Sequence, residues 1–185
     1  TRAAEQVEPF SAEIRARGGE PVEVPVIAFR RPEDPSEIKK ILARLQEYHW
    51  IIFTSANGVR FFFEILREAG FDYPVGVKTA VVGQKTLRVL QKYGVNADVV
   101  PEQFVAESLL ERLKSEVRSG DAVLMPRGNL ARKKLPEELS EFGVNVTDLV
   151  VYETVVNRDG GKTLNTLLKD RRLDMVTFTS SSTVK

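Results

Sequence analysis

Two copies of one short motif carry much of the polar chemistry in this sequence. Residues 53–60 read FTSANGVR and residues 178–184 read FTSSSTV, so each apolar segment ends in Phe-Thr-Ser and continues into small polar residues. If each motif joins a parallel strand to a helix, its hydroxyls and the first helical N–H groups can bind an anion. The same residue types are also common helix caps, and this alternative remains open. The candidate ligand-binding residues of the two motifs are Ser55, Ala56, Asn57, Gly58, Ser180, Ser181 and Ser182.

Two further turns have the same character. Residues 81–86 read VVGQKT and residues 125–130 read MPRGNL, each with a glycine that allows close approach of a ligand to the backbone. Turns that follow parallel strands emerge at the same edge of the sheet, so together they predict a ligand with several acidic groups. Neither turn matches G-x-G-x-x-G or the P-loop pattern, which disfavours a nucleotide. The candidate residues here are Gly83, Gln84, Thr86, Arg127, Gly128 and Asn129.

Conventional catalytic side chains are scarce. The sequence has no cysteine, so it has no thiolate nucleophile and no cysteine-based zinc site, and its one histidine, His49, leaves no histidine pair for a metal. Tyr152, within VVYETVV, is the best candidate acid. A phenol with a pKa of about 10 keeps its proton at neutral pH and can donate it to a departing hydroxyl group. The alternative is a tyrosine that only packs against a strand.

An alternation of strands and helices positions these residues. Apolar segments at 50–54, 78–82, 97–100 and 121–125 are each followed by a segment with helical periodicity. Glycines end several of these helices, among them Gly70, Gly94 and Gly143. Repeated strand-helix units with short turns predict an α/β fold with a parallel sheet covered on both faces.

The two ends of the chain predict a second, discontinuous domain. Extended segments at 22–31 and 148–158 bracket the middle of the chain and are expected to form a two-stranded linker. Residues 32–147 would then be an inserted α/β domain, and 1–21 with 159–185 would form a domain incomplete at both ends, with a strand at 174–179. The alternative is that the ends form a small accessory lobe.

Composition excludes several classes of protein. The 27 basic and 26 acidic residues give a net charge of +1, which excludes a polybasic nucleic-acid binder. No apolar run approaches the roughly 20 residues that a membrane span requires, and no apolar signal segment opens the sequence. A folded, cytoplasmic protein is therefore expected.

The motifs in their order resemble those of the uroporphyrinogen-III synthase (HemD) family. The resemblance rests on FTSANGV, VVGQKT, VPEQFVAESLLERL, RGNLARKKLPEEL, VYETV and FTSSSTV, and it covers nearly the whole chain. It implies two flavodoxin-like parallel-sheet domains, one inserted in the other and joined by a two-stranded β linker. It further implies a monomer that works without a cofactor.

The same resemblance implies a reaction. A synthase of this family is a lyase that cyclises hydroxymethylbilane to uroporphyrinogen III, inverting ring D and releasing water. Tyr152 would assist the leaving hydroxyl, and the polar turns would hold the eight carboxylates of the substrate, many of them through main-chain N–H groups. Transient contact with hydroxymethylbilane synthase is a further expectation.

Two other classes of function remain as alternatives. A non-enzymatic two-domain hinge protein that binds a polycarboxylate would share the polar turns without needing a proton donor. A flavodoxin-like electron carrier would need flavin-stacking aromatics beside the first turn, whereas residues 61–63 are expected inside a helix.

Overall fold

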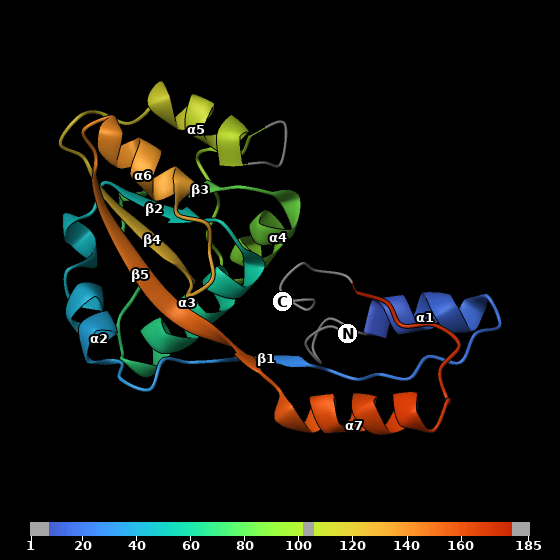
Figure 1. Cartoon of the computed structure of the whole chain (residues 1–185). Coiled ribbons are helices and arrows are strands. Elements are labelled where there is room, and N and C mark those ends of the chain that lie inside the picture. The colour runs from blue at the N-terminus through green and yellow to red at the C-terminus, as the bar shows by residue number, and fades with distance from the viewer. Residues whose placement is uncertain (1–7, 102–105, 179–185) are drawn as a thin grey trace. The chain divides into compact units, whose positions relative to one another are not determined.

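The computed structural model describes residues 8–101 and 106–178. The chain divides into two compact units, one made of Thr1–Arg30 and Thr154–Lys185 and the other of Arg31–Glu153. The elements, drawn in Figure 1, are α1 (Glu8–Ala16), β1 (Ile27–Arg30), α2 (Ser36–Leu42), the 3₁₀ turn η2 (Leu45–Glu47), β2 (Trp50–Phe53), α3 (Ala56–Glu68), β3 (Lys78–Val81), α4 (Gln84–Lys92), α5 (Ala106–Lys114), β4 (Ala122–Gly128), α6 (Lys134–Glu141), β5 (Asn145–Val156) and α7 (Arg158–Lys169).

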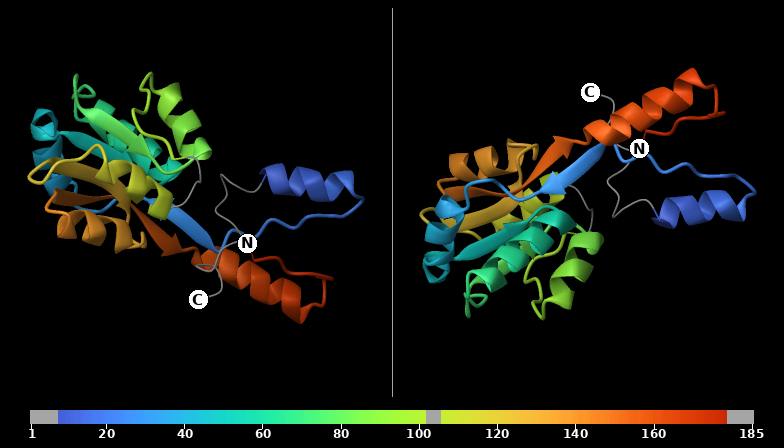
Figure 2. Two further views of the ribbon diagram at one scale, coloured as in Figure 1. Left: turned by 90° about the horizontal axis from the view of Figure 1, so that it is seen from above. Right: turned by 90° about the horizontal axis from the view of Figure 1, so that it is seen from below.

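The strands form one sheet in the order β1-β5-β4-β2-β3. β2 is parallel to both β3 and β4, and β4 is parallel to β5. Figure 2 shows β1 beside the long strand β5, although the two are far apart in the sequence. The connection from β2 leads outward to β3, while the connection from β4 leads in the opposite direction to β5. This confirms the expected α/β class and makes the boundary between β2 and β4 the switch point of the sheet.

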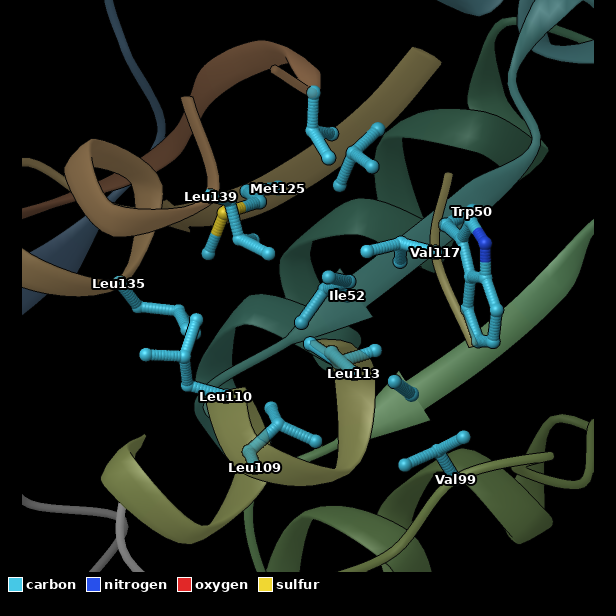
Figure 3. Close-up of a cluster of buried hydrophobic side chains, with 13 residues drawn as sticks. Trp50, Ile52, Val99, Leu109, Leu110, Leu113, Val117, Met125, Leu135 and Leu139 are labelled. Atoms are coloured by element: carbon cyan, nitrogen blue, oxygen red, sulfur yellow. The ribbon is translucent and has the colours of Figure 1, made fainter. Parts of the chain in front are cut away.

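Alternating side chains of β2 fill the two faces of the sheet. Trp50 and Ile52 belong to a buried cluster with residues of α5 and α6, which is drawn in Figure 3. Phe53 points to the other face, where its ring meets the ring of Phe62 on α3 at 5.4 Å. All four residues of β2 are buried, as expected for a central parallel strand covered by helices on both sides.

Helix ends are fixed by local chemistry that the sequence predicts. The hydroxyl of Ser55 caps α3 by accepting a hydrogen bond from the Gly58 N–H. At the other end Gly70 has a φ of +75°, and the Phe71 N–H donates to the Leu66 carbonyl at 3.1 Å, which is the Schellman pattern. Gly94 and Gly143 also have positive φ after α4 and α6, so the predicted helix ends are confirmed.

Three expected strands are shorter or missing in the described residues. The segment 22–31 is a strand only over Ile27–Arg30, because Pro25 lacks the N–H group that a ladder needs. The segment 97–100 makes one bridge, between Val99 and Ala80 at the outer side of β3. Residues 174–178 are in no strand, and Thr179 lies outside the described residues.

The smaller unit contains α1, β1, α7 and the end of β5 among its described residues. Asn157 caps α7 through its side chain, and its N–H donates to the Val26 carbonyl at 2.8 Å. Gly160 lies so close to the Pro25 carbonyl that no side chain fits there. None of the described helices of either unit is both long and apolar enough to cross a membrane.

Candidate functional site

The carboxyl ends of β2 and β4 bring the strongest site candidates together. The turn after β2 starts α3 at Ser55, and β4 ends at Gly128 on the adjacent strand. Gly58 packs directly on β4, because a Cβ placed there would lie 2.8 Å from the Pro126 carbonyl oxygen. Any side chain at Gly58 would push the start of α3 away from the sheet, so this glycine sets the approach of α3 to β4.

Tyr152 reaches this same point from β5. The strand register shifts between Arg127 and Gly128, since Arg127 pairs with Val150 and Gly128 with Tyr152. A regular register would have placed Val151 opposite Gly128. The shift instead brings the Tyr152 ring over Gly128, where an added Cβ would lie 2.5 Å from the ring carbon Cζ. Gly128 thus leaves room for the phenol ring.

The Tyr152 hydroxyl lies next to the cap of α3. Its oxygen is 3.4 Å from the Ser55 hydroxyl oxygen, and either group can be the donor. The Tyr152 carbonyl accepts a hydrogen bond of 3.1 Å from the Asn129 N–H, which ties the turn after β4 to β5. Ser55 therefore caps its helix and also contacts the candidate acid, so the two interpretations of this residue are compatible.

Arg127 is held inside the protein. Its guanidinium makes a two-pronged ion pair with Asp148 on β5, and Nη1 donates to the Arg132 carbonyl at 2.7 Å. The Arg127 side chain is only 6% exposed, compared with 39% for Asp148. The sequence predicts that Arg127 binds a carboxylate of the ligand. In this structure it instead fixes the path of the turn after β4.

The turn after β3 is built differently. Gly83 precedes α4 in an extended conformation, and no side chain caps the helix there. Gln84 is exposed at the first position of α4, whereas Thr86 is buried. This turn presents the backbone N–H groups of a helix start, with the exposed side chains of Gln84 and Lys85 in the first turn of the helix.

The remaining predicted residues are placed as follows. Ala56 and Asn57 form the first two positions of α3, and Asn129 is exposed directly after β4. Ser180, Ser181 and Ser182 lie outside the described residues. The structure thus brings together Ser55, Gly58, Gly128 and Tyr152, with the backbone of Asn129.

His49 belongs to the opposite edge of the sheet. Its Nδ1 accepts a hydrogen bond from the Ala122 N–H at 3.0 Å, at the amino ends of β2 and β4. The described residues hold no group of three or more His, Cys, Asp or Glu side chains that could bind a metal ion. His49 therefore serves the fold at a distance from the candidate acid.

Two neighbours of the site were not predicted from the sequence. Phe61 on α3 stacks on the Tyr152 ring with centroids 5.3 Å apart and an interplanar angle of 20°. Asp148 is the partner of Arg127. The run of Phe61, Phe62 and Phe63 contained a signal for the first, because successive helical residues are rotated by about 100° and cannot all face one core. Asp148 gave no comparable signal.

A doubly wound sheet with polar turns at its carboxyl switch point is typical of α/β proteins that bind a ligand at this edge. Residues 8–185 match the family model described as "Uroporphyrinogen-III synthase HemD". The chain therefore belongs to the uroporphyrinogen-III synthase family, whose members serve porphyrin biosynthesis.

Individual relatives agree with this assignment. The chain is 33% identical to the uroporphyrinogen-III synthase of Synechococcus elongatus, over all of this chain and 70% of that protein. It is also 33% identical to a protein of Methanothermobacter thermautotrophicus named as a putative uroporphyrinogen-III synthase, over all of this chain and 72% of that protein.

A solved structure is similar in fold. A mutant uroporphyrinogen III synthase from Thermus thermophilus superposes with a TM-score of 0.68 at 22% identity, covering 94% of this chain and 70% of the other. At this identity the match supports the α/β fold alone. These comparisons do not support the alternative of a non-enzymatic binding protein.

Proposed function

We propose that this protein is a uroporphyrinogen-III synthase that cyclises hydroxymethylbilane to uroporphyrinogen III, inverting ring D and releasing water, as a lyase of tetrapyrrole biosynthesis. The observation that carries the proposal is the position of Tyr152. In a chain of this family, its phenol lies at the carboxyl edge of the sheet, 3.4 Å from the hydroxyl that caps α3.

Tyr152 acts as the proton donor in this proposal. The phenol gives its proton to the hydroxyl group of the substrate while the carbon–oxygen bond breaks, so the hydroxyl leaves as water. The electron-rich pyrrole stabilises the resulting cation, and the last ring attacks it through its substituted α-carbon to form a spiro intermediate. The bond from that carbon to its original methylene bridge then breaks, and the freed methylene carbon bonds to the other α-carbon of the same ring. That carbon loses its proton, which restores the phenol. The enzyme's main task is to hold the chain in the geometry that gives the inverted product.

The polar turns bind the substrate carboxylates. The start of α3 offers the N–H groups of its first turn with Ser55 and Asn57, and the start of α4 offers those that follow Gly83. Asn129 is exposed beside them after β4. Because Arg127 is committed to Asp148, we assign it to holding this edge in place rather than to a substrate carboxylate. Binding is spread over several neutral donors, each contributing about 1.5–3 kcal/mol to a charged acceptor.

The domain arrangement is part of the proposal. Residues 32–147 form an inserted flavodoxin-like domain, residues 22–31 and 148–158 form the two-stranded linker, and residues 1–21 with 159–185 belong to the second domain. Support comes from the smaller compact unit, which is assembled from both ends of the chain, and from the order that places β1 beside β5.

Product analysis tests the proposed reaction. The purified protein is incubated with freshly prepared hydroxymethylbilane, the products are oxidised, and the type I and type III porphyrin isomers are separated by chromatography. We expect mainly type III, because ring inversion requires the enzyme. Exclusive formation of type I, the product of spontaneous closure, contradicts the proposal, and an equal result with the heat-denatured protein does so as well.

A further inference from the structure

The run of three phenylalanines on α3 sends its side chains in different directions. Phe62 lies in the core with no exposed surface and contacts Phe53 edge-on. Phe61 and Phe63 are 7% and 8% exposed, and each stacks on tyrosine. Phe61 stacks on Tyr152, whereas Phe63 stacks both on Tyr93, with centroids 4.4 Å apart at 10°, and on Tyr73, with centroids 5.3 Å apart at 17°. Two phenylalanines of α3 thus stack on tyrosines, and only the contact of Phe61 involves the candidate acid.

The Tyr152 ring is confined by more than one element. Gly128 on β4 leaves only enough room for the ring, since an added Cβ would be 2.6 Å from Cε2 and 2.8 Å from the hydroxyl oxygen. Phe61 covers the ring in a nearly parallel stack. The hydrogen bond from the Asn129 N–H to the Tyr152 carbonyl holds the main chain of Tyr152. The hydroxyl is consequently aimed at the start of α3 by packing, although its contact with Ser55 is long.

We propose that Phe61 is a positioning residue that holds the Tyr152 phenol in the orientation needed for proton donation, an inference that rests on the proposed synthase function. A flat ring in parallel contact restricts rotation of the phenol about its own axis and about χ1. An aliphatic side chain of similar size fills the space but removes this restriction. Misplacing a reacting group by about 1 Å can reduce a rate by as much as about 100-fold.

Phe63 provides a matched control on the same helix. The substitutions Phe61→Leu and Phe63→Leu remove the same atoms from two buried positions of α3. The first breaks the stack on Tyr152, and the second breaks the stacks on Tyr73 and Tyr93. Both should lower thermal stability, and Phe63→Leu at least as much as Phe61→Leu, because it loses two tyrosine stacks. Only the first should affect proton donation.

A spectroscopic measurement tests the contact without relying on activity. The chain has four tyrosines, so incorporation of 3-fluorotyrosine gives a simple fluorine NMR spectrum in which Tyr152→Phe identifies the Tyr152 signal. We expect Phe61→Leu to shift or broaden that signal, and Phe63→Leu to leave it in place while moving the Tyr73 and Tyr93 signals. A Tyr152 signal unaffected by Phe61→Leu overturns the inference.

Kinetics then test the role in the reaction. We expect Phe61→Leu to lower kcat about tenfold or more with a smaller change in KM, and Phe63→Leu to keep kcat within about twofold. In a double-mutant cycle, Phe61→Leu should have no further effect on kcat when Tyr152 is already phenylalanine. Equal kcat losses in the two single variants, or full additivity in the cycle, overturn the inference while leaving the synthase function intact. Absence of type III product from the wild-type protein overturns the proposed function, and the inference falls with it.

Discussion

Two tyrosines stack on α3 in different surroundings. Tyr73 lies in the connection to β3, near the amino edge of the sheet, and Tyr152 lies on β5 at the carboxyl edge. Tyr73 stacks on Phe63 with centroids 5.3 Å apart at 17°, and Tyr152 stacks on Phe61 at 5.3 Å and 20°. The ring contacts are thus nearly equal. The Tyr73 hydroxyl, however, is 2.7 Å from the Thr79 hydroxyl at the start of β3, whereas the Tyr152 hydroxyl is 3.4 Å from Ser55 at the carboxyl edge.

This difference separates a structural tyrosine from a candidate catalytic one. Burial raises the pKa of Tyr73 to about 12, against a weaker opposing effect of its hydrogen bond to Thr79. Thr79 is itself held by Asp98, whose carboxylate accepts from the Thr79 N–H at 2.7 Å. A close hydrogen bond inside a packed cluster stabilises the fold, whereas the Tyr152 hydroxyl lies beside a helix start at the carboxyl edge of the sheet, where α/β proteins bind their ligands.

The largest expected effect comes from removing each hydroxyl in turn. Tyr152→Phe should lower kcat by about 100-fold or more, as the loss of a general acid does, with little change in stability. Tyr73→Phe should leave kcat within about twofold while costing about 1 kcal/mol of stability, because Thr79 loses its partner. Initial-rate kinetics and urea unfolding of both variants measure the two effects. A large loss of kcat in Tyr73→Phe with little change in Tyr152→Phe would contradict the catalytic role of Tyr152.

Alkaline pH should lower the stability of the protein through ionisation of Tyr73. The unfolded phenol loses its proton near pH 10, while the folded one keeps it until about pH 12, so the folded state binds more protons between these values. Stability is therefore unaffected by this group below about pH 10 and falls above it, by about 2–3 kcal/mol near pH 12.

Comparison with Tyr73→Phe isolates this contribution from other groups that titrate at high pH. The variant should be the less stable protein below about pH 10 and the more stable one near pH 12. Urea unfolding followed by circular dichroism at several pH values measures the difference. A stability difference that stays constant over this range would show that Tyr73 is not buried as described.

The next effect concerns the space that Tyr152 occupies. Gly128→Ala should displace the phenol ring, lower kcat about tenfold and cost about 1–3 kcal/mol, as overpacking does. Gly161→Ala is the control, because a Cβ at this position in α7 meets nothing within 4 Å. That variant should be slightly stabilised, since alanine is a better helix former than glycine. Kinetics and thermal unfolding of both proteins test the pair, and a fully active Gly128→Ala variant would contradict the proposed confinement.

Local patterns made much of this architecture predictable. The apolar runs before Ser55 and Gly83 and the glycines after α3 and α6 identify strands and helices through short-range chemistry. The contact between Tyr152 and Ser55 was not predictable in the same way. It depends on the register shift between Arg127 and Gly128, which selects Tyr152 over Val151 and becomes visible only when β4 pairs with β5.

The position of Arg127 shows the same limit. Its sequence context, beside Gly128 and Asn129 in a turn, favours an exposed arginine that binds a carboxylate of the ligand. Its actual partner, Asp148, is on the neighbouring strand and is chosen by the pairing of β4 with β5. Long-range pairing thus decides whether a charged residue faces the ligand or the protein.

The smallest expected effect compares the helix caps. Ser55→Ala removes the cap of α3 and should cost about 1 kcal/mol of stability, and Asn157→Ala should cost a similar amount at the start of α7. Ser55→Ala should also lower turnover, by less than about tenfold, because Tyr152 and the backbone N–H groups remain. Thr86→Ala is expected to have a comparably small effect on turnover, and Asn157→Ala none.

These small losses distinguish distributed binding from side-chain catalysis. If the carboxylates are held mainly by main-chain N–H groups, removing one hydroxyl leaves most of the binding free energy in place, and KM should change more than kcat. Steady-state kinetics of Ser55→Ala beside Tyr152→Phe make the comparison directly. A larger fall in kcat for Ser55→Ala than for Tyr152→Phe would mean that the serine hydroxyl, and not the phenol, delivers the proton to the leaving group.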